Sequence, residues 1–286
     1  MSISEILSVK KGGSGPLGIT STLQLFECPR KFTLVQKYGS KSNVNMMRGS
    51  IMHLLLEYFY RGEPLPTIDF DPNSEWTAEW DRMWACFRWY RGKYEPREFG
   101  KPKGVESRYP QNEKQQALLN NALYPGFSCA FDLDIKPTAK QIEKLNAAHD
   151  VVLFPGFWYL LDHKCTAHFS NEWFLDKKYS YQMRTYEAAY RTLFPKRKFG
   201  GILINGINWS SPSYGRRLML LPPMTDEEFE AWERMILFLR GTLKMHNLRA
   251  NLGLNIVPAN PTTGHCIYPS PCQFLGECGA HGQATK

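Results

Sequence analysis

The chain has 286 residues, of which 43% are hydrophobic, 14% aromatic and 22% charged. This composition is typical of a folded protein with a large core, and it excludes disorder over most of the length. Lys and Arg outnumber Asp and Glu by 35 to 27, giving a formal charge of +8. Such a charge favours a polyanionic partner such as nucleic acid, although many proteins of other function are equally basic.

The chain is predicted to begin with helices. Apolar residues recur at helical spacing over Ser21 to Tyr38 and over Met46 to Tyr60. Asn73 or Ser74 is a candidate N-cap for a third helix, rich in Trp, that ends near Tyr94. We therefore expect a helical N-terminal part of about three helices.

From Val105 onward the pattern changes to short apolar runs that predict strands. These runs are Val105 to Tyr109, Gly126 to Ile135, Gly156 to His163, Gly201 to Trp209 and Arg217 to Leu221. Two further helices are predicted over Tyr179 to Leu193 and over Asp226 to His246, the second with Thr225 as N-cap. Helices that flank a mixed sheet predict the α/β fold class.

One predicted strand, Tyr159 to Thr166, carries an Asp-x-Lys pattern. Residues two apart in a strand share a face, so Asp162 and Lys164 should project together while His163 points the other way. The carboxylate could hold Mg²⁺ or Mn²⁺, and the ammonium could orient water or stabilise charge on a phosphate. This combination suits phosphodiester hydrolysis, but an ordinary exposed ion pair has the same pattern.

Further acids precede this strand. Asp132 and Asp134 end an apolar run, and Asp132 could share a metal ion with Asp162, because Mg²⁺ takes one or two carboxylates together with water and substrate oxygens. These aspartates could equally end a strand in solvent. Glu106 is a third candidate acid, on the strand before them.

After the Asp-x-Lys strand, Gln182 and Tyr186 are four residues apart on a predicted helix. They should therefore lie on one face, where both could bind phosphate or bases. Packing of Tyr186 in the core is the alternative.

Four cysteines suggest a metal-bound clasp between the two ends of the chain. Cys266, Cys272 and Cys278 form C-x5-C-x5-C in a tail, residues 251–286, that has no periodicity, and Cys28 lies near the N-terminus. Four thiolates suit either tetrahedral Zn²⁺ or a [4Fe-4S] cluster, and the paired C-x2-C knuckles usual for zinc do not occur. The remaining cysteines, Cys86, Cys129 and Cys165, are expected to be buried thiols.

Taken together, the Glu, the Asp, the Asp-x-Lys pair and the Gln-x-x-x-Tyr pair follow the order of the RecB-like branch of the PD-(D/E)xK nuclease superfamily, which the chain resembles. The segments STLQLFECPRKF and RGSIMHLLLEYF are similar to its first two helices. The likeness spans Ser21 to Cys278 and extends to nucleases of phages and to the iron-sulfur exonucleases of CRISPR adaptation.

The resemblance implies a central mixed sheet with flanking helices and the following roles. His53, Asp132 and Asp162 would bind the metal, Glu106 would assist, Lys164 would be catalytic, and Gln182 and Tyr186 would bind substrate. One early Cys followed by three late ones is the layout of the iron-sulfur members. Those members more often have C-x2-C-x5-C, so the wider first gap leaves zinc as an alternative.

We therefore expect one nuclease domain over residues 1–286, with a helical part at 21–100, an α/β core at 101–250 and a Cys-rich tail that packs on the first helix. The expected function is that of a Mg²⁺- or Mn²⁺-dependent deoxyribonuclease, an exonuclease on single-stranded or frayed DNA ends in recombination, repair or phage DNA processing.

Two alternatives remain. One is a non-catalytic DNA-binding protein of the same fold, and the other is a zinc-stapled interaction protein whose acids are solvated. The N-terminus has no apolar signal region, and no run reaches the roughly 18 apolar residues of a membrane span, so we expect a cytoplasmic location, in a bacterium or a phage-infected host, and no membrane partner.

Overall fold

The computed structural model describes residues 17–38, 44–65, 67–68, 74–210 and 212–252. Its N-terminal helices are α2 (Ile19–Thr22), α3 (Gln24–Glu27), α4 (Pro29–Tyr38), α5 (Val44–Arg61) and α6 (Glu75–Lys93). The prediction of one continuous helix over Ser21 to Tyr38 is wrong. Cys28 is extended, with φ −160° and ψ 102°, because the ring of Pro29 disfavours helical backbone at the preceding residue.

The centre of the fold is a mixed sheet, as predicted. Its strands, in the order β1-β2-β3-β4-β5, are β1 (Gly104–Tyr109), β2 (Cys129–Ile135), β3 (Trp158–Thr166), β4 (Phe199–Asn208) and β5 (Gly215–Leu221). β3 and β4 are parallel, and the other neighbours are antiparallel. The later helices are α7 (Glu113–Ala122), α8 (Ala139–Ala148), α9 (Asn171–Lys178), α10 (Tyr181–Leu193) and α11 (Asp226–Asn251). This arrangement confirms the α/β class.

Three short helices, α7, α8 and α9, are not predicted by the sequence patterns. Each begins at a polar N-cap whose side chain accepts a hydrogen bond from the backbone N–H three residues on; the caps are Asn112, Thr138 and Ser170. Such caps satisfy N–H groups that a helix start leaves unpaired. Capping rather than a long apolar stripe therefore marks these helices.

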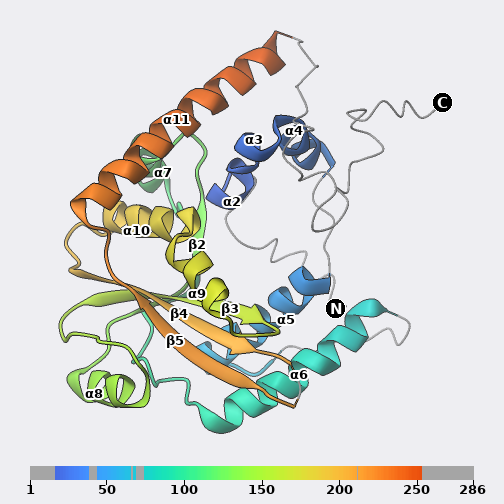
Figure 1. Cartoon of the computed structure of the whole chain (residues 1–286), viewed down its shortest axis with the longest axis vertical. Coiled ribbons are helices and arrows are strands. Elements are labelled where there is room, and N and C mark those ends of the chain that lie inside the picture. The colour runs from blue at the N-terminus through green and yellow to red at the C-terminus, as the bar shows by residue number, and fades with distance from the viewer. Residues whose placement is uncertain (1–16, 39–43, 66, 69–73, 211, 253–286) are drawn as a thin grey trace.

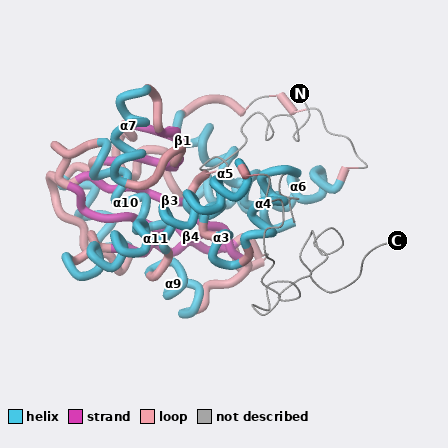
Figure 2. The backbone as a smooth tube through the Cα atoms, turned by 90° about the horizontal axis from the view of Figure 1, so that it is seen from above, coloured by secondary structure: helices cyan, strands magenta, loops and turns pink. Residues whose placement is uncertain are grey.

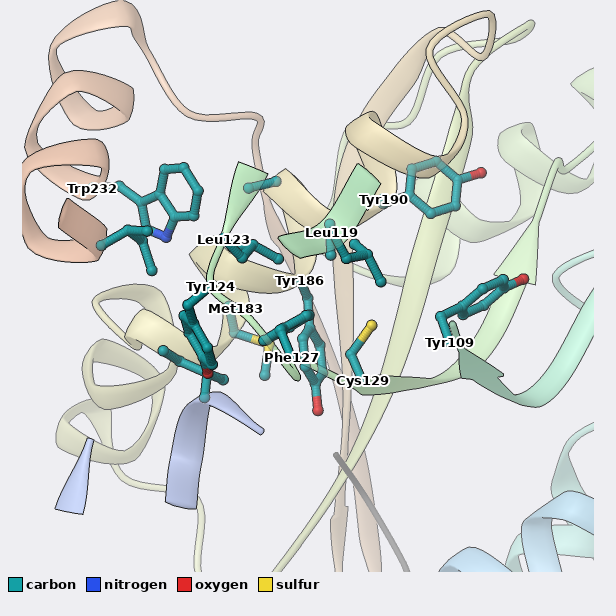
Figure 3. Packing of buried hydrophobic residues seen from close by; sticks show 14 of the residues in the cluster. Tyr109, Leu119, Leu123, Tyr124, Phe127, Cys129, Met183, Tyr186, Tyr190 and Trp232 are labelled. Atoms are coloured by element: carbon teal, nitrogen blue, oxygen red, sulfur yellow. The ribbon is translucent and has the colours of Figure 1, made fainter. Parts of the chain in front are cut away.

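The sheet has a hydrophobic core on each face. Tyr159 and Leu161 of β3 point into the core beneath α5, α6 and α8, and Leu160 points into the core beneath α7, α10 and α11. Figure 1 shows these two groups of helices on opposite sides of the strands. We call them the α5-side core and the α10-side core; Figure 3 shows part of the latter.

The N-terminal helices α3 to α6 gather toward one end of the molecule (Figure 2). Within that group, α5 packs against α6 and against strands β1 and β3. None of the described helices is both long and apolar enough to cross a membrane. The position of α5 matters most for the site, because it brings an N-terminal side chain over the middle of the sheet.

Candidate metal centre and active site

Three acidic residues form a row across neighbouring strands. The register of β1 with β2 places Glu106 opposite Asp132. The register of β2 with β3, continued by one residue, places Asp132 opposite Asp162. Opposite residues on antiparallel strands have Cβ atoms about 4.5–5.5 Å apart. The fold therefore brings together the three carboxylates that the sequence suggested.

The two central strands separate at this row. β2 and β3 pair only over residues 133–135 and 159–161, so regular pairing stops just before Asp132 and Asp162. The backbone N–H of His163 instead donates a hydrogen bond to Asp132 Oδ2, at 2.6 Å. A carboxylate thus occupies the opening between the strands.

Helix α5 adds an imidazole to the row. His53 Nδ1 lies 3.3 Å from Glu106 Oε1 and 3.6 Å from Asp132 Oδ2. One ligand atom from each of these three residues lies within 4.8 Å of the others, so the group could hold a metal ion. The sequence alone gave no reason to select this His; the resemblance did.

The Asp-x-Lys pair lies beside this group. Lys164 Nζ donates a hydrogen bond to Asp162 Oδ1 at 3.1 Å and lies 2.9 Å from Oδ2. The contact with Oδ2 has the geometry of an ion pair, and this buried oxygen accepts no hydrogen bond from the described residues. Asp162 is 5% exposed, so the alternative of a solvated surface pair does not hold for it.

Burial and the gathering of carboxylates together make the site take up protons. Burial lowers the pKa of His53, but Asp132 and Glu106 outweigh that effect and raise it to about 9. Burial raises the pKa of Asp132 to about 7, with His53 opposing the rise and the neighbouring carboxylates adding to it. A proton therefore resides where a divalent cation would neutralise the same charges.

The ammonium of Lys164 stays charged. Burial acts to lower its pKa, but the carboxylates of Asp162 and Asp132 outweigh burial and raise the pKa above its ordinary value. Lys164 in this state is a hydrogen-bond donor and a positive charge, not a base.

Gln182 and Tyr186 do share one face of α10. Gln182 Nε2 donates to the Tyr186 hydroxyl at 3.0 Å. The Tyr186 ring packs in the α10-side core (Figure 3), edge-on to Phe131 with ring centroids 5.7 Å apart. Burial raises the pKa of its hydroxyl to about 12, and Lys164 acts against that rise. Tyr186 therefore packs in the core, as the alternative held, and its hydroxyl also lies close enough to Lys164 to feel its charge.

Asp134 is not part of the site. It accepts a hydrogen bond from the Tyr190 hydroxyl at 2.8 Å and pairs with Arg197 on the α10 side of the sheet. Both contacts satisfy its buried charge. The alternative that the two aspartates of β2 end in solvent is wrong for Asp134, which is 4% exposed.

The cysteine prediction falls only partly on described residues. Cys28 is 5% exposed, and its Sγ accepts a hydrogen bond from the backbone N–H of Lys31 at 3.4 Å. Cys266, Cys272 and Cys278 lie outside the described residues. None of the four cysteines among the described residues forms a disulfide; Cys86 and Cys129 are buried and Cys165 is partly buried.

Comparison with known sequences identifies the family. The sequence model of the PD-(D/E)XK nuclease superfamily matches residues 19–277. The chain belongs to this superfamily. No protein of curated function matches it. Membership supports a metal-dependent nuclease with DNA as substrate, and nucleases of this superfamily typically use Mg²⁺ or Mn²⁺.

Sequence reasoning missed the polar residues beneath this candidate site. Asn205 is fully buried and bonds to the ring of His163, and the Arg216 side chain is fully buried beside it. The available signal was Asn205 itself, an amide in the interior of the apolar run of β4. Buried polar groups are nearly always hydrogen-bonded, so such an amide predicts a partner, although it does not identify which one.

Proposed function

We propose that this PD-(D/E)XK protein is a Mg²⁺- or Mn²⁺-dependent deoxyribonuclease, specifically an exonuclease that acts on single-stranded or frayed DNA ends. The observation that carries the nuclease proposal is the convergence of His53, Glu106 and Asp132 within 4.8 Å, next to the Asp162–Lys164 pair. Resemblance to the RecB-like branch, rather than geometry, supports the preference for DNA ends and a role in recombination, repair or phage DNA processing.

The donor set fits a hard divalent cation. Carboxylate oxygens predominate, with one imidazole nitrogen, and such a set suits Mg²⁺ or Mn²⁺ better than softer metals. The buried Asp162 Oδ2, which accepts no hydrogen bond from the described residues, has lone pairs to offer the same ion. His53, Glu106, Asp132 and Asp162 are therefore the residues that would hold it.

A bound divalent cation would polarise a phosphoryl oxygen and make an attacking water more acidic. The protein's own groups would do the rest. Lys164, which stays protonated, donates hydrogen bonds to the water or to a phosphate oxygen, and its charge stabilises the negative charge that grows on the phosphate. Gln182 and Tyr186, which are hydrogen-bonded to each other on α10, would bind the substrate strand.

Two substitutions test this function. Asp162→Asn and Lys164→Met should each lower the rate of nucleotide release from end-labelled DNA in Mn²⁺ by about 100-fold or more. The first removes a carboxylate charge that would hold the cation, and the second removes the ammonium that stabilises charge on the phosphate. Lys178→Met is the matched control, since Lys178 is an exposed lysine on α9. Full activity in either site variant would exclude the mechanism.

The same assay separates the alternatives. A non-catalytic DNA-binding protein would bind the labelled strand and release no nucleotide with either metal. Linear substrates with single-stranded or blunt ends, together with circular DNA, then test the preference for ends, because an exonuclease leaves a circle intact.

We also propose that Cys28, Cys266, Cys272 and Cys278 hold a [4Fe-4S] cluster, or alternatively zinc, which joins the tail to the N-terminal helices of a single nuclease domain. Support comes from the cysteine layout and from the N–H···S hydrogen bond at Cys28, since such bonds accompany the cysteine sulfurs of iron-sulfur clusters.

Protein purified without oxygen should contain iron and absorb near ~400 nm, as iron-thiolate sites do. Cys28→Ser should lose most of that iron. The control Cys86→Ala should keep it, because Cys86 is a buried thiol that donates to the backbone carbonyl of Asn208. Zinc without iron in the wild-type protein would establish the alternative.

A further inference from the structure

A closed ring of hydrogen bonds lies in the α5-side core, beneath the candidate active site. Arg216 donates to Asn205 Oδ1 at 2.8 Å and to Glu98 Oε2 at 2.7 Å. Asn205 Nδ2 donates to the Tyr90 hydroxyl at 3.1 Å. The Tyr90 and Tyr60 hydroxyls are 2.8 Å apart, and Tyr60 donates to Glu98 Oε1 at 3.4 Å, which closes the ring.

The Arg216 guanidinium and the Glu98 carboxylate together fix the direction of the bonds in the ring. A guanidinium can only donate, so the atom of Asn205 that faces it must be the amide oxygen. The amide nitrogen of Asn205 therefore points the other way, toward Tyr90 and His163. Because the Tyr60 hydroxyl donates its hydrogen bond to the Glu98 carboxylate, the Tyr90 hydroxyl must donate to Tyr60.

This direction determines the state of His163. Asn205 Nδ2 lies 2.8 Å from His163 Nδ1 and must be the donor, so Nδ1 carries no proton and the neutral ring carries its proton on Nε2. That Nε2 is buried and makes no hydrogen bond with any described residue. The imidazole also stacks on Tyr60, with ring centroids 5.3 Å apart and planes at 21°.

His163 connects the ring to the metal-binding residues. It stands between Asp162 and Lys164 on β3, and its backbone N–H donates to Asp132 Oδ2. At this point β3 has lost its regular pairing with β2 but stays paired with β4. The hydrogen bond to Asn205 and the ring stack on Tyr60 hold the His163 side chain, and with it the stretch of β3 that carries the peptide N–H.

We propose that this ring is a positioning device for the metal site: it fixes His163 with its proton on Nε2 and, through the His163 peptide N–H, holds Asp132 in place to bind the divalent cation. The inference rests on the proposed function for its kinetic consequence, but not for its structural content. His163 is thus a positioning residue that acts through Asp132.

The tautomer can be measured without metal or substrate. In ¹⁵N-histidine-labelled wild type, the ring signals that disappear in His163→Phe should show Nδ1 unprotonated and Nε2 protonated. Asn205→Asp presents only acceptors to the His163 imidazole and should move the imidazole proton to Nδ1. Finding Nδ1 protonated in the wild type would overturn the inference, whatever the protein's activity.

Metal dependence tests the connection to Asp132. His163→Phe keeps a ring that can stack on Tyr60 and loses the acceptor, whereas His163→Asn keeps an acceptor near the position of Nδ1 and loses the ring. We expect His163→Phe to raise the half-saturating Mn²⁺ concentration by about 10-fold or more, the effect usual for residues that support metal ligands, and His163→Asn to restore most of the affinity.

The control is Asn146→Ala, which removes an amide on α8 that makes two hydrogen bonds to the backbone of Leu153 and none to the ring. It should leave the Mn²⁺ dependence unchanged. Mn²⁺ binding is measured by electron paramagnetic resonance as well as by nuclease rate. If the wild type binds Mn²⁺ without cutting DNA, the proposed function fails while the inference is still decided by binding. Equal affinity in wild type and His163→Phe would overturn it.

Discussion

Glu106 has a backbone conformation that an L-residue rarely adopts in a strand, with φ +48°. The left-handed region costs a non-glycine residue about 1–2 kcal/mol, and strain of this kind persists where the surrounding structure imposes it. Here the strained residue is also the one whose carboxylate contacts His53 at 3.3 Å. The conformation of Glu106 therefore lowers stability at a position that the candidate metal site uses.

Glycine and alanine substitutions at this position separate strain from chemistry. Glu106→Gly and Glu106→Ala both remove the carboxylate and should lower nuclease activity to a similar extent. The glycine variant should be the more stable by about 1 kcal/mol in urea unfolding without divalent metal, since glycine adopts this φ freely but loses more entropy on folding. Equal stability of the two variants would show that the conformation carries no strain.

The residues of the site were predictable to different degrees. Asp162 and Lys164 followed from period-two spacing on a strand, which is a local property of the sequence. His53 lies 79 positions before Asp132 in the chain, and no local pattern connects the two. The ring around Asn205 joins residues from α5, α6, β4 and β5 with the loop that carries Glu98, so only the tertiary structure could reveal it.

Elements followed their local signals where those signals were strong. The β-branched and aromatic runs predict all five strands, and Thr225 as N-cap predicts the start of α11. The short helices α7, α8 and α9 have too few residues for a periodic stripe. Pro29 divides the first predicted helix, because apolar periodicity alone does not register a backbone restriction.

Two glycines test how well element geometry explains stability. Gly241 lies inside α11 with no atom within 4 Å of an added Cβ, so Gly241→Ala should raise the free energy of unfolding by about 0.5–1 kcal/mol through helix propensity. Gly201 on β4 has φ +124°, and a Cβ there would lie 2.3 Å from the carbonyl oxygen of Leu221.

Gly201→Ala should therefore lower the free energy of unfolding by about 2 kcal/mol or more, because backbone rather than a flexible side chain must move. Both variants are compared with wild type by urea unfolding. A loss at Gly241 equal to that at Gly201 would mean that another part of the chain occupies the space beside Gly241, and the argument from helix propensity would fail.

At the scale of the whole molecule, the N-terminal helices meet the last described helix through an aromatic contact. His246 of α11 packs edge-on against Phe32 of α4, with ring centroids 5.3 Å apart. Burial lowers the pKa of His246 below its ordinary value of 6.5. The folded state therefore disfavours a proton that the unfolded chain accepts.

The sign of the pH effect follows from this difference. Below pH ~6.5 the unfolded chain binds the proton first, so His246 reduces stability as the pH falls, by at most about 1.4 kcal/mol per pH unit. Asp132, whose pKa is raised, opposes this trend. The measured dependence of the unfolding free energy on pH is a sum over all such groups, so only the difference between a variant and wild type isolates one group.

His246→Gln should flatten the fall in unfolding free energy between pH 7 and pH 5 relative to wild type. His168→Gln, at an exposed position, controls for the loss of a histidine, and equal slopes in both variants and wild type would exclude the His246 contact as a pH-sensitive connection between the two ends of the described chain.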